Sequence, residues 1–310
     1  MSNFPKVSIF MPVFNQQDYI EESILSIVGQ TFSNWELVIS DDCSTDSTYE
    51  IALNYQSKYP NKIKVFRNNV NVGITKNCNI VLRECKGKYI SFFAGDDLLH
   101  KDKIRKQYEV MESNKNIFLC YHDVEVFDSD TNEDLYVWNK DKKVINYSSV
   151  HNFAENLIRN GTYTLCAVSC FMRNRNNLSY DERLKTLSDT MFFIDSCMSE
   201  VESSYVFYIN EVLASYRKHK KSITANYNVY RHEEFLLNAY IEEKYQDNAL
   251  LSIIGRRSKL YSDYALLYMK KNKYKIARRI LVSCFFSDFK LLHIRRFLGS
   301  YLKQLNIRKS

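Results

Sequence analysis

The chain has 310 residues, enough for one large domain or one domain with an appendage, and 45% of them are hydrophobic, enough for a sizeable core. With only 7 Gly and 3 Pro, it has no room for a long flexible linker or a low-complexity region. The net charge of +7 is uneven, because residues 217–310 contain 21 Lys and Arg against 7 Asp and Glu. Such a basic tail fits an anionic membrane surface or nucleic acid, and no nucleic-acid-binding motif accompanies it, so no nucleic-acid partner is expected.

The cysteines and the N-terminus bear on the compartment. The eight Cys form no CxxC pair, and Cys166 and Cys170 are four apart without a nearby His, so free thiols in a reducing compartment are expected. Residues 1–14 lack the cationic and apolar regions of a signal peptide. No window approaches the ~20 apolar residues of a membrane-spanning helix. We expect a cytoplasmic protein, with peripheral contact at the inner face of the plasma membrane as an option.

Strands and helices alternate along the first hundred residues. Apolar runs predict strands, and apolar residues at helical spacing predict helices. The second helix is expected to begin with a Ser or Thr cap at Ser47. The expected elements are strand 7–11 ended by Pro12, a turn at 15–18, a helix from Ile20 ending near Gly29, strand 35–40, a helix from Ser47, strand 63–66, helix 77–85 and strand 89–93.

This alternation predicts right-handed βαβ units on a parallel sheet covered on both faces. Ligands of such sheets lie beyond the carboxyl ends of the strands. Three of those ends contain residues 12–15, Asp41-Asp42 and Asp96-Asp97, which together predict a nucleotide-plus-metal site at one rim. Neither GxGxxG nor GxxxxGK[ST] is present, so a dinucleotide dehydrogenase and a P-loop enzyme are not supported.

The adjacent acids Asp96 and Asp97 follow the apolar strand and the small pair Ala94-Gly95. Like charges side by side repel, and a divalent cation between them and a polyanion makes the arrangement favourable. The alternative is that the two acids cap a helix, since residues 98–111 have a helical pattern and acids favour a helix N-terminus.

The segments VSIFMPVFN, ILSIVGQTFSNWELVISDDCSTDST, NVGITKNCN and GKYISFFAGDD appear in order and with characteristic spacing. In this respect residues 6–99 resemble the family 2 glycosyltransferases of the GT-A fold, a Rossmann-like mixed, mostly parallel α/β sheet flanked by helices. The resemblance is weaker over residues 180–224. Ala94 stands where the family's first metal-site acid is common, and the QxxRW signature of processive synthases is absent, which favours transfer of a single sugar.

The resemblance implies roles for the residues at the rim. Asp97 would bind Mn²⁺ or Mg²⁺ directly, and Asp96 would contact the ribose or a metal-bound water. Asp42 would bind the nucleobase, with uridine favoured, although Asp41 could simply cap the turn that follows. The remaining expected contacts are Pro12, Val13 and Phe14 lining the base pocket, Lys76 offsetting diphosphate charge unless it is merely solvated, and His219 of the segment YRKH completing the metal shell or touching the diphosphate.

The general base is expected in the second half of the chain. The segment LSDTMFF resembles the family stretch in which an acidic pair opens a helix under the acceptor site; Ser188 replaces the first acid and Asp189 keeps the second. Asp189 is therefore the expected catalytic base of an inverting transfer. The alternative is that Ser188 and Asp189 cap their own helix, with Asp181 and Glu182 as substitute bases.

The expected organisation is a glycosyltransferase domain at 1–226, with a nucleotide-binding half (1–100) and an acceptor half (101–226), followed by a basic helical region at 227–310. That region is expected to form helices at 230–245, 249–272, 275–285 and 290–305. These helices could contact an anionic membrane or only cap the domain.

The predicted function is transfer of one sugar from a nucleotide-sugar donor, with a UDP-sugar favoured, to a saccharide acceptor in surface polysaccharide synthesis. The basic tail favours an acceptor linked to a polyprenyl diphosphate. Two alternatives are a sugar-phosphate nucleotidyltransferase, which would need a Gly- and Arg-rich phosphate loop, and a saccharide- or nucleotide-sugar-binding protein that has lost catalysis.

Overall fold

The computed structural model describes residues 5–138, 149–161, 165–175, 177–220, 222, 227–287, 296 and 298. The chain divides into two compact units. The first comprises residues 1–157 and 162–234, and the second comprises residues 158–161 and 235–310.

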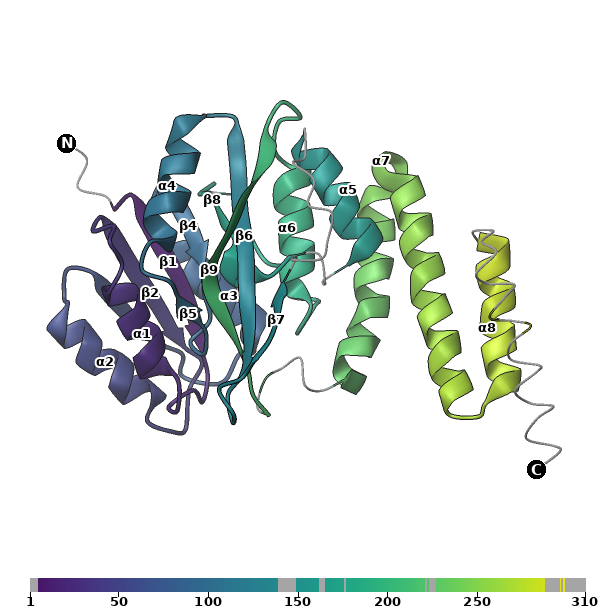
Figure 1. Ribbon diagram of the computed structural model, residues 1–310, viewed down its shortest axis with the longest axis horizontal. Coiled ribbons are helices and arrows are strands. Elements are labelled where there is room, and N and C mark those ends of the chain that lie inside the picture. Colours follow the sequence, from purple (N-terminus) through teal and green to yellow (C-terminus); the bar gives the residue numbers. More distant parts are fainter. Residues whose placement is uncertain are drawn as a thin grey trace. The chain divides into compact units, whose positions relative to one another are not determined.

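A nine-stranded mixed sheet forms the centre of the first unit (Figure 1). Its strand order is β3-β2-β1-β4-β8-β6-β9-β5, with β7 paired to β6. The strands β1 to β4 are parallel to one another where they pair, as are β6 and β9, and the remaining pairs are antiparallel. The strands are β1 Val7–Val13, β2 Trp35–Asp41, β3 Ile63–Arg67, β4 Tyr89–Phe92, β5 Leu98–Leu99, β6 Ile117–Asp128, β7 Asp134–Trp138, β8 Phe171–Arg173 and β9 Tyr205–Lys218.

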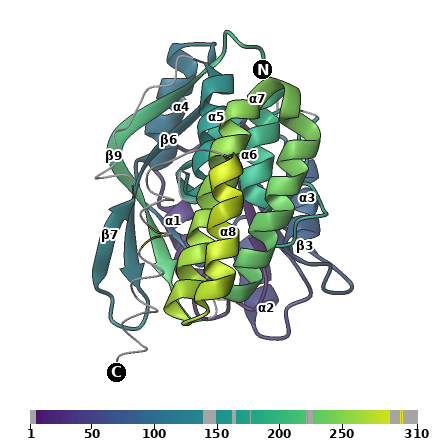
Figure 2. The same ribbon diagram turned by 90° about the vertical axis from the view of Figure 1, so that its right-hand side faces the viewer.

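Helices flank the sheet, so the predicted α/β fold with a mixed, mostly parallel sheet is confirmed. The two long strands β6 and β9 lie side by side and curl, as Figure 2 shows. The helices of the first unit are α1 Ile20–Val28, α2 Thr48–Lys58, α3 Ile74–Glu84, α4 Lys103–Ser113, the short 3-10 helix η2 Ala167–Ser169, α6 Ser188–Met198 and α5 Val150–Asn160, whose last residues belong to the second unit.

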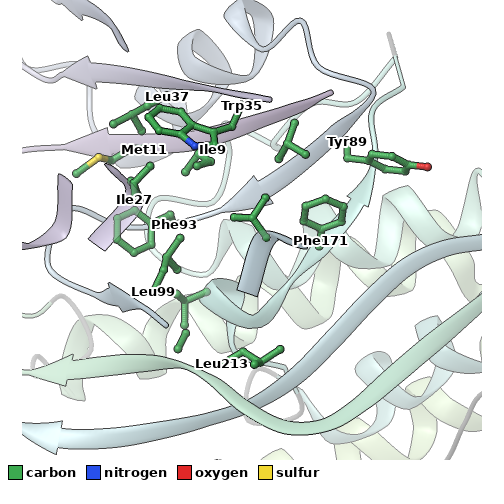
Figure 3. Close-up of a cluster of buried hydrophobic side chains, with 14 of the residues drawn as sticks. Ile9, Met11, Ile27, Trp35, Leu37, Tyr89, Phe93, Leu99, Phe171 and Leu213 are labelled. Atoms are coloured by element: carbon green, nitrogen blue, oxygen red, sulfur yellow. The ribbon is translucent and has the colours of Figure 1, made fainter. Parts of the chain in front are cut away.

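Successive side chains of β1 enter two separate cores, because neighbouring residues of a strand point to opposite faces. Ile9 and Met11 pack in one cluster with Ile27 of α1 and with residues of α2 and α4, and Figure 3 shows Phe93, Leu99 and Leu213 joined to it. Phe10 faces the other way, with its ring 5.4 Å from that of Phe92 and 6.0 Å from that of Tyr180. Burial on both faces explains why the strand has no polar alternation.

The expected ends of the early elements are correct to within three residues, and the differences have local causes. β1 continues through Pro12 to Val13 because its pairing with β4 ends at Phe10, so the missing N–H of Pro12 removes no bond on that side. The third helix starts at Ile74, just after Gly73 with φ +89°. Ser47 is the N-cap of α2, but its side chain makes no capping bond, and Asp46 accepts the N–H of Thr48 instead.

The acids Asp96 and Asp97 do not cap a helix, so that alternative is wrong. The short strand β5 follows them directly, and its register is set by pairing with β9. The next helix, α4, begins only at Lys103, with Asp102 as its N-cap. The helical pattern over residues 98–111 therefore predicted the helix correctly but placed its start too early.

The second unit is helical. The expected helices 230–245 and 249–272 belong to one element, α7 Tyr227–Lys270, whose first residues lie in the first unit. It is followed by α8 Tyr274–Ser287, which packs through Ala277 and Leu281 against Ala265 and Met269. The expected helix 290–305 lies outside the described residues except for positions 296 and 298. Within the described residues, no helix is long and apolar enough to cross a membrane.

Candidate active site

Three strand ends come together at one rim of the sheet. Val13, the last residue of β1, is in register with Asp41, the last residue of β2. The backbone N–H of Asp42 donates to the carbonyl of Val13 at 2.9 Å, and Asn68 beyond β3 donates to the carbonyl of Asp41 at 2.9 Å. On the other side of β1, Phe93 beyond β4 donates to the carbonyl of Phe10 at 3.0 Å. The sheet thus holds the segments 13–15, 41–44 and 93–97 next to one another.

The buried carboxylate of Asp42 holds the loop before α3. Its Oδ1 accepts from the backbone N–H of Val72 at 2.8 Å and from the side chain of Asn68 at 2.9 Å, and its Oδ2 accepts from Gly73 at 2.9 Å. Each carboxylate oxygen offers about two acceptor positions, so one remains on Oδ2. Asp42 therefore shapes the loop and keeps one position for a ligand donor.

Asp41 caps the turn that follows β2, as the alternative interpretation of this residue predicted. Its Oδ2 accepts from the backbone N–H of Ser44 at 3.0 Å, which closes the turn after β2, and it lies 3.4 Å from the guanidinium of Arg67. Cys43 between them has φ +61°, a left-handed conformation that the turn requires. Asp41 is thus a structural residue.

The other expected nucleotide contacts differ in exposure. Pro12 and Val13 are buried, and Val13 belongs to the core cluster, so it can meet a ligand only through its backbone. Phe14 is 44% exposed, and it follows Val13, whose carbonyl accepts from the backbone N–H of Asp42. Lys76 is exposed on the first turn of α3, and the described residues provide it with no hydrogen-bond or ion-pair partner.

Asp96 and Asp97 are tied to the carboxyl end of β9. His219 places its Nε2 2.9 Å from Oδ2 of Asp96, and the backbone N–H of Arg217 donates to Oδ1 of Asp97 at 3.1 Å. The buried guanidinium of Arg217 donates to the carbonyl of Asp96 at 2.8 Å and to Glu22 at 2.5 Å. Burial and the neighbouring charge of Asp96 raise the pKa of Asp97 well above its ordinary value.

We name Asp96, Asp97, Arg217 and His219 the diphosphate cluster, after the role that the sequence predicts for this part of the rim. Glycine is required beside it, because a Cβ on Gly95 would lie 2.4 Å from the side-chain oxygen of Gln16 and 2.7 Å from Val13. The ring of Tyr19 covers the other side, 4.6 Å from the ring of His219 and 5.1 Å from the guanidinium of Arg217. The cluster is therefore packed on several sides by α1 and by the loop that precedes it.

The residues of this cluster suit a divalent cation that a ligand helps to bind. Two carboxylates and an imidazole are acceptable donors for Mn²⁺ or Mg²⁺, and such ions often take the rest of their shell from substrate phosphates. His219 Nδ1 is buried without a hydrogen-bond partner among the described residues, and Asp97 is a buried carboxylate, so both would gain from a cation or its ligands. No group of three His, Cys, Asp or Glu side chains in the described part of the chain forms a ready-made metal cage.

Asp189 lies in the first turn of α6, where the side chains make no capping bond. It keeps contact with solvent, yet the protein on its other sides removes enough water to raise the pKa of its carboxyl to about 6. The charges of Asp189 and Asp42 both raise the pKa of the buried Cys78 thiol on α3, so both carboxylates lie within electrostatic range of one residue. The interpretation of Asp189 as a helix cap is not supported.

The two substitute bases have other contacts. Asp181 accepts from the side chain of Arg183 at 2.7 Å, and Glu182 accepts from Asn79 of α3 at 3.1 Å. Both residues lie in the segment 180–187 that leads to α6, and Asp189 follows two residues after the end of this segment.

The sequence interpretation missed two side chains near the site. Arg217 lies inside the segment that identified His219, so its position two residues before that His could have drawn attention to it. Glu233 on α7 bonds to the segment just before α6. It is one acid among several in a helical stretch, and nothing in its local sequence distinguishes it.

Comparison with known proteins gives one family. The family model described as glycosyl transferase family 2 matches residues 8–180. An uncharacterized glycosyltransferase of Haemophilus influenzae is 30% identical over 72% of this chain and 84% of its own length. EpsE and TuaG of Bacillus subtilis, a putative glycosyltransferase and a putative teichuronic acid biosynthesis glycosyltransferase, are 36% and 39% identical, but the matches cover only 46% and 44% of their lengths.

Solved structures show the same fold. Staphylococcus aureus TarS residues 1–349, in complex with UDP-GlcNAc, superposes with a TM-score of 0.58 at 18% identity, covering 96% of this chain and 89% of that one. The mannosyltransferase PcManGT of Pyrobaculum calidifontis, in complex with GDP-Man and Mn²⁺, gives a TM-score of 0.58 at 14% identity, covering 97% and 81%. At these identities the likeness establishes the GT-A type of fold.

Proposed function

The chain belongs to glycosyl transferase family 2, and on this basis we propose that it transfers a single sugar, with inversion, from a UDP-sugar to a saccharide acceptor. The observation that supports this best is that α3 bonds to both regions: Gly73, its N-cap, donates to Asp42, and Thr75 and Asn79 bond to the segment that precedes Asp189. The loop beside the residue suited to the nucleobase and the segment before the residue suited to the acceptor are therefore both fixed by one helix. The family alone would leave the position of the base open.

In this proposal the nucleotide lies along the rim from Phe14 to Asp96. The exposed ring of Phe14 packs on the base, and the remaining acceptor position of Asp42 takes the pyrimidine N–H. The ribose lies next to Asp96. Asp42 already holds loop 68–73 through Asn68, Val72 and Gly73, so little of this loop has to be ordered when the donor binds.

The diphosphate lies at the diphosphate cluster. Asp97 and Asp96 would hold Mn²⁺ or Mg²⁺, with His219 as a further ligand, and the bound ion would supply Lewis-acid charge to the leaving diphosphate. Arg217 keeps both acids in place through its backbone and side chain. Lys76, exposed on α3, adds positive charge for the same group.

Asp189 acts as the general base. Its carboxylate accepts the proton of the acceptor hydroxyl as that oxygen attacks the anomeric carbon from the face opposite the leaving group. The new bond joins the acceptor oxygen to the anomeric carbon, the bond to the diphosphate oxygen breaks, and the leaving nucleoside diphosphate takes that electron pair. A pKa of about 6 suits this role, because the carboxylate is ionised at neutral pH and is still a better base than an ordinary Asp.

The acceptor is proposed to be a lipid-linked saccharide used in surface polysaccharide synthesis. The putative role of TuaG in teichuronic acid biosynthesis supports a polysaccharide product. Lys271, Lys273 and Lys275 are exposed around the turn between α7 and α8, next to the 42% exposed Ile276, which suits contact with an anionic membrane surface.

The experiment that tests this function is hydrolysis and transfer with a panel of nucleotide sugars, with and without Mn²⁺ or Mg²⁺. Metal-dependent release of UDP from one donor, lost in Asp97→Ala, supports the proposal and identifies the sugar. Binding of a donor without release, even with a lipid-linked acceptor extract, favours a binding protein that has lost catalysis. That rival rests on Ala94 and Ser188, which replace common family acids.

A further inference from the structure

Glu233, near the start of α7, binds the segment that precedes α6. Its Oε1 accepts from the backbone N–H of Lys185 at 2.8 Å. Its Oε2 accepts from the backbone N–H of Thr186 at 2.6 Å, from the hydroxyl of Thr186 at 2.7 Å and from the backbone N–H of Leu187 at 2.8 Å. One carboxylate thus takes four donors from three consecutive residues, the last of which is the N-cap of α6.

This arrangement is specific to a carboxylate. Glu233 is only 4% exposed, and a buried acid is unfavourable unless its oxygens accept hydrogen bonds. Burial by itself raises the pKa of Glu233, but the bonds from Thr186, Leu187 and Lys185 outweigh this and hold the pKa below its ordinary value. In a capping box an acid in the first helical turn bonds back to the N-cap N–H; here an acid from a distant helix makes that bond.

The same segment is fixed at its other end by α3. Asn79 accepts from the backbone N–H of Tyr180 at 2.7 Å and donates to the carbonyl of the same residue at 3.0 Å. Thr75 donates its hydroxyl to the carbonyl of Leu184 at 2.5 Å. Residues 180–187 are therefore held by two side chains of α3 and by Glu233, immediately before Asp189.

We propose that Glu233 is a positioning residue for the reaction: by binding residues 185–187 it fixes the first turn of α6 so that Asp189 faces the acceptor instead of turning back to cap its helix. This inference rests on the proposed role of Asp189 as base. Asp189 is exposed, and the described residues give it no hydrogen-bond or ion-pair partner, so its carboxylate is accessible to a substrate. Without Glu233, the loosened turn exposes backbone N–H groups that attract the Asp189 carboxylate.

The test is Glu233→Gln, which keeps the shape but puts an N–H₂ group where donors already point. We expect kcat to fall by roughly 10- to 100-fold, as for a small misplacement of a catalytic group, while the KM for the donor and the Kd for UDP stay within about twofold. The acid limb of the pH profile, set by Asp189, moves below about pH 6 because the carboxylate gains water and N–H donors. Glu243→Gln, an exposed position on the same helix, is the matched control and keeps wild-type values.

An unchanged kcat and pH profile in Glu233→Gln overturns the inference. If that variant fails to fold, Thr186→Val removes only the hydroxyl bond. Its kcat is then expected to fall by roughly two- to tenfold, with the same direction of pH shift, and wild-type behaviour overturns the inference.

Asp189→Asn separates the two proposals. A fully active Asp189→Asn means that the base is wrongly assigned, whereas an inactive Asp189→Asn with a normal Glu233→Gln means that only the positioning role is wrong.

Discussion

The diphosphate cluster and the segment around Asp189 use acidic side chains in opposite ways. In the diphosphate cluster the backbone N–H of Arg217 donates to the Asp97 carboxylate and the imidazole of His219 contacts that of Asp96, while His219 Nδ1 lacks a hydrogen-bond partner among the described residues. Before α6, Glu233 has four donors on its two oxygens, and the described residues give Asp189 no hydrogen-bond partner. In the proposed mechanism a ligand completes the first region, whereas hydrogen bonds within the protein organise the second.

In the proposed mechanism this difference follows from what each region would bind. A diphosphate with its cation brings its own charge and ligands, so protein donors that filled the site beforehand would have to be displaced. An acceptor hydroxyl brings only one weakly acidic proton, so the base must be oriented and kept partly desolvated in advance. The comparison predicts that the activity depends on metal and donor concentration through the first region. Through the second region it depends on hydrogen bonds within the protein.

Removal of the metal should have the largest effect. Chelation is expected to lower transfer by about 10³-fold, because the leaving diphosphate loses its counter-charge, and Mn²⁺ or Mg²⁺ should restore it. Asp97→Asn should raise the metal concentration needed for half-maximal activity, measured by titration of the metal into the enzyme. Full activity in chelator would remove the metal from the proposal and leave Arg217 and His219 as the counter-charge.

Asp189→Asn is expected to lower kcat by about 10²- to 10³-fold with little change in UDP affinity, because the proton acceptor is lost and the donor site is not. Thermal unfolding at pH 8 should not become easier. The raised pKa of Asp189 means that its ionised form is disfavoured in the folded state, so its contribution to stability is largest below the ordinary value of 3.8 and is lost as the pH rises through about 6. A variant that is inactive because it is unfolded would contradict this.

The pH profile gives a sharper version of the same prediction. Since Asp189 must be ionised to accept a proton, kcat should rise about tenfold per pH unit below about 6 and level off above it. The residual activity of Asp189→Asn should lack this limb. A wild-type limb near pH 4 would place the base in an ordinary, well-hydrated environment.

Arg217→Lys tests the frame of the diphosphate cluster. Lysine keeps the charge but loses the planar group that reaches both the Asp96 carbonyl and Glu22, so we expect a loss of about 2 kcal/mol in the free energy of unfolding. The apparent affinity for metal and donor should fall together, as measured by calorimetry. Lys218→Arg, at the next position, is the control and should change neither.

The smallest effect is expected at the α7–α8 turn. Lys275→Gln should weaken binding to anionic vesicles about fivefold, since one Lys near such a surface contributes about 1 kcal/mol. Sedimentation with vesicles that contain an anionic phospholipid measures this, with vesicles of neutral phospholipid as the control. Equal binding to both kinds of vesicle would contradict electrostatic contact.

The alternation of strands and helices, and the acids at the strand ends, could be predicted from the amino-acid sequence alone. Both follow from short-range rules: a strand buried on both faces is continuously apolar, and polar residues concentrate where it ends. For this reason the sequence pattern was sufficient to locate β1, β2 and the segment 94–97, and to place Asp42, Asp96 and Asp97 on one rim.

The way in which the second half completes the site depends on the tertiary structure. Glu233 meets Thr186 across 47 positions and Arg217 meets Asp96 across 121, and neither pair has a local pattern that could reveal it. The fold also gives Asp41 a turn and Asp42 a loop, although the two are identical neighbours in sequence. Long-range contacts of this kind depend on which faces pack together, and that is a property of the whole folded chain.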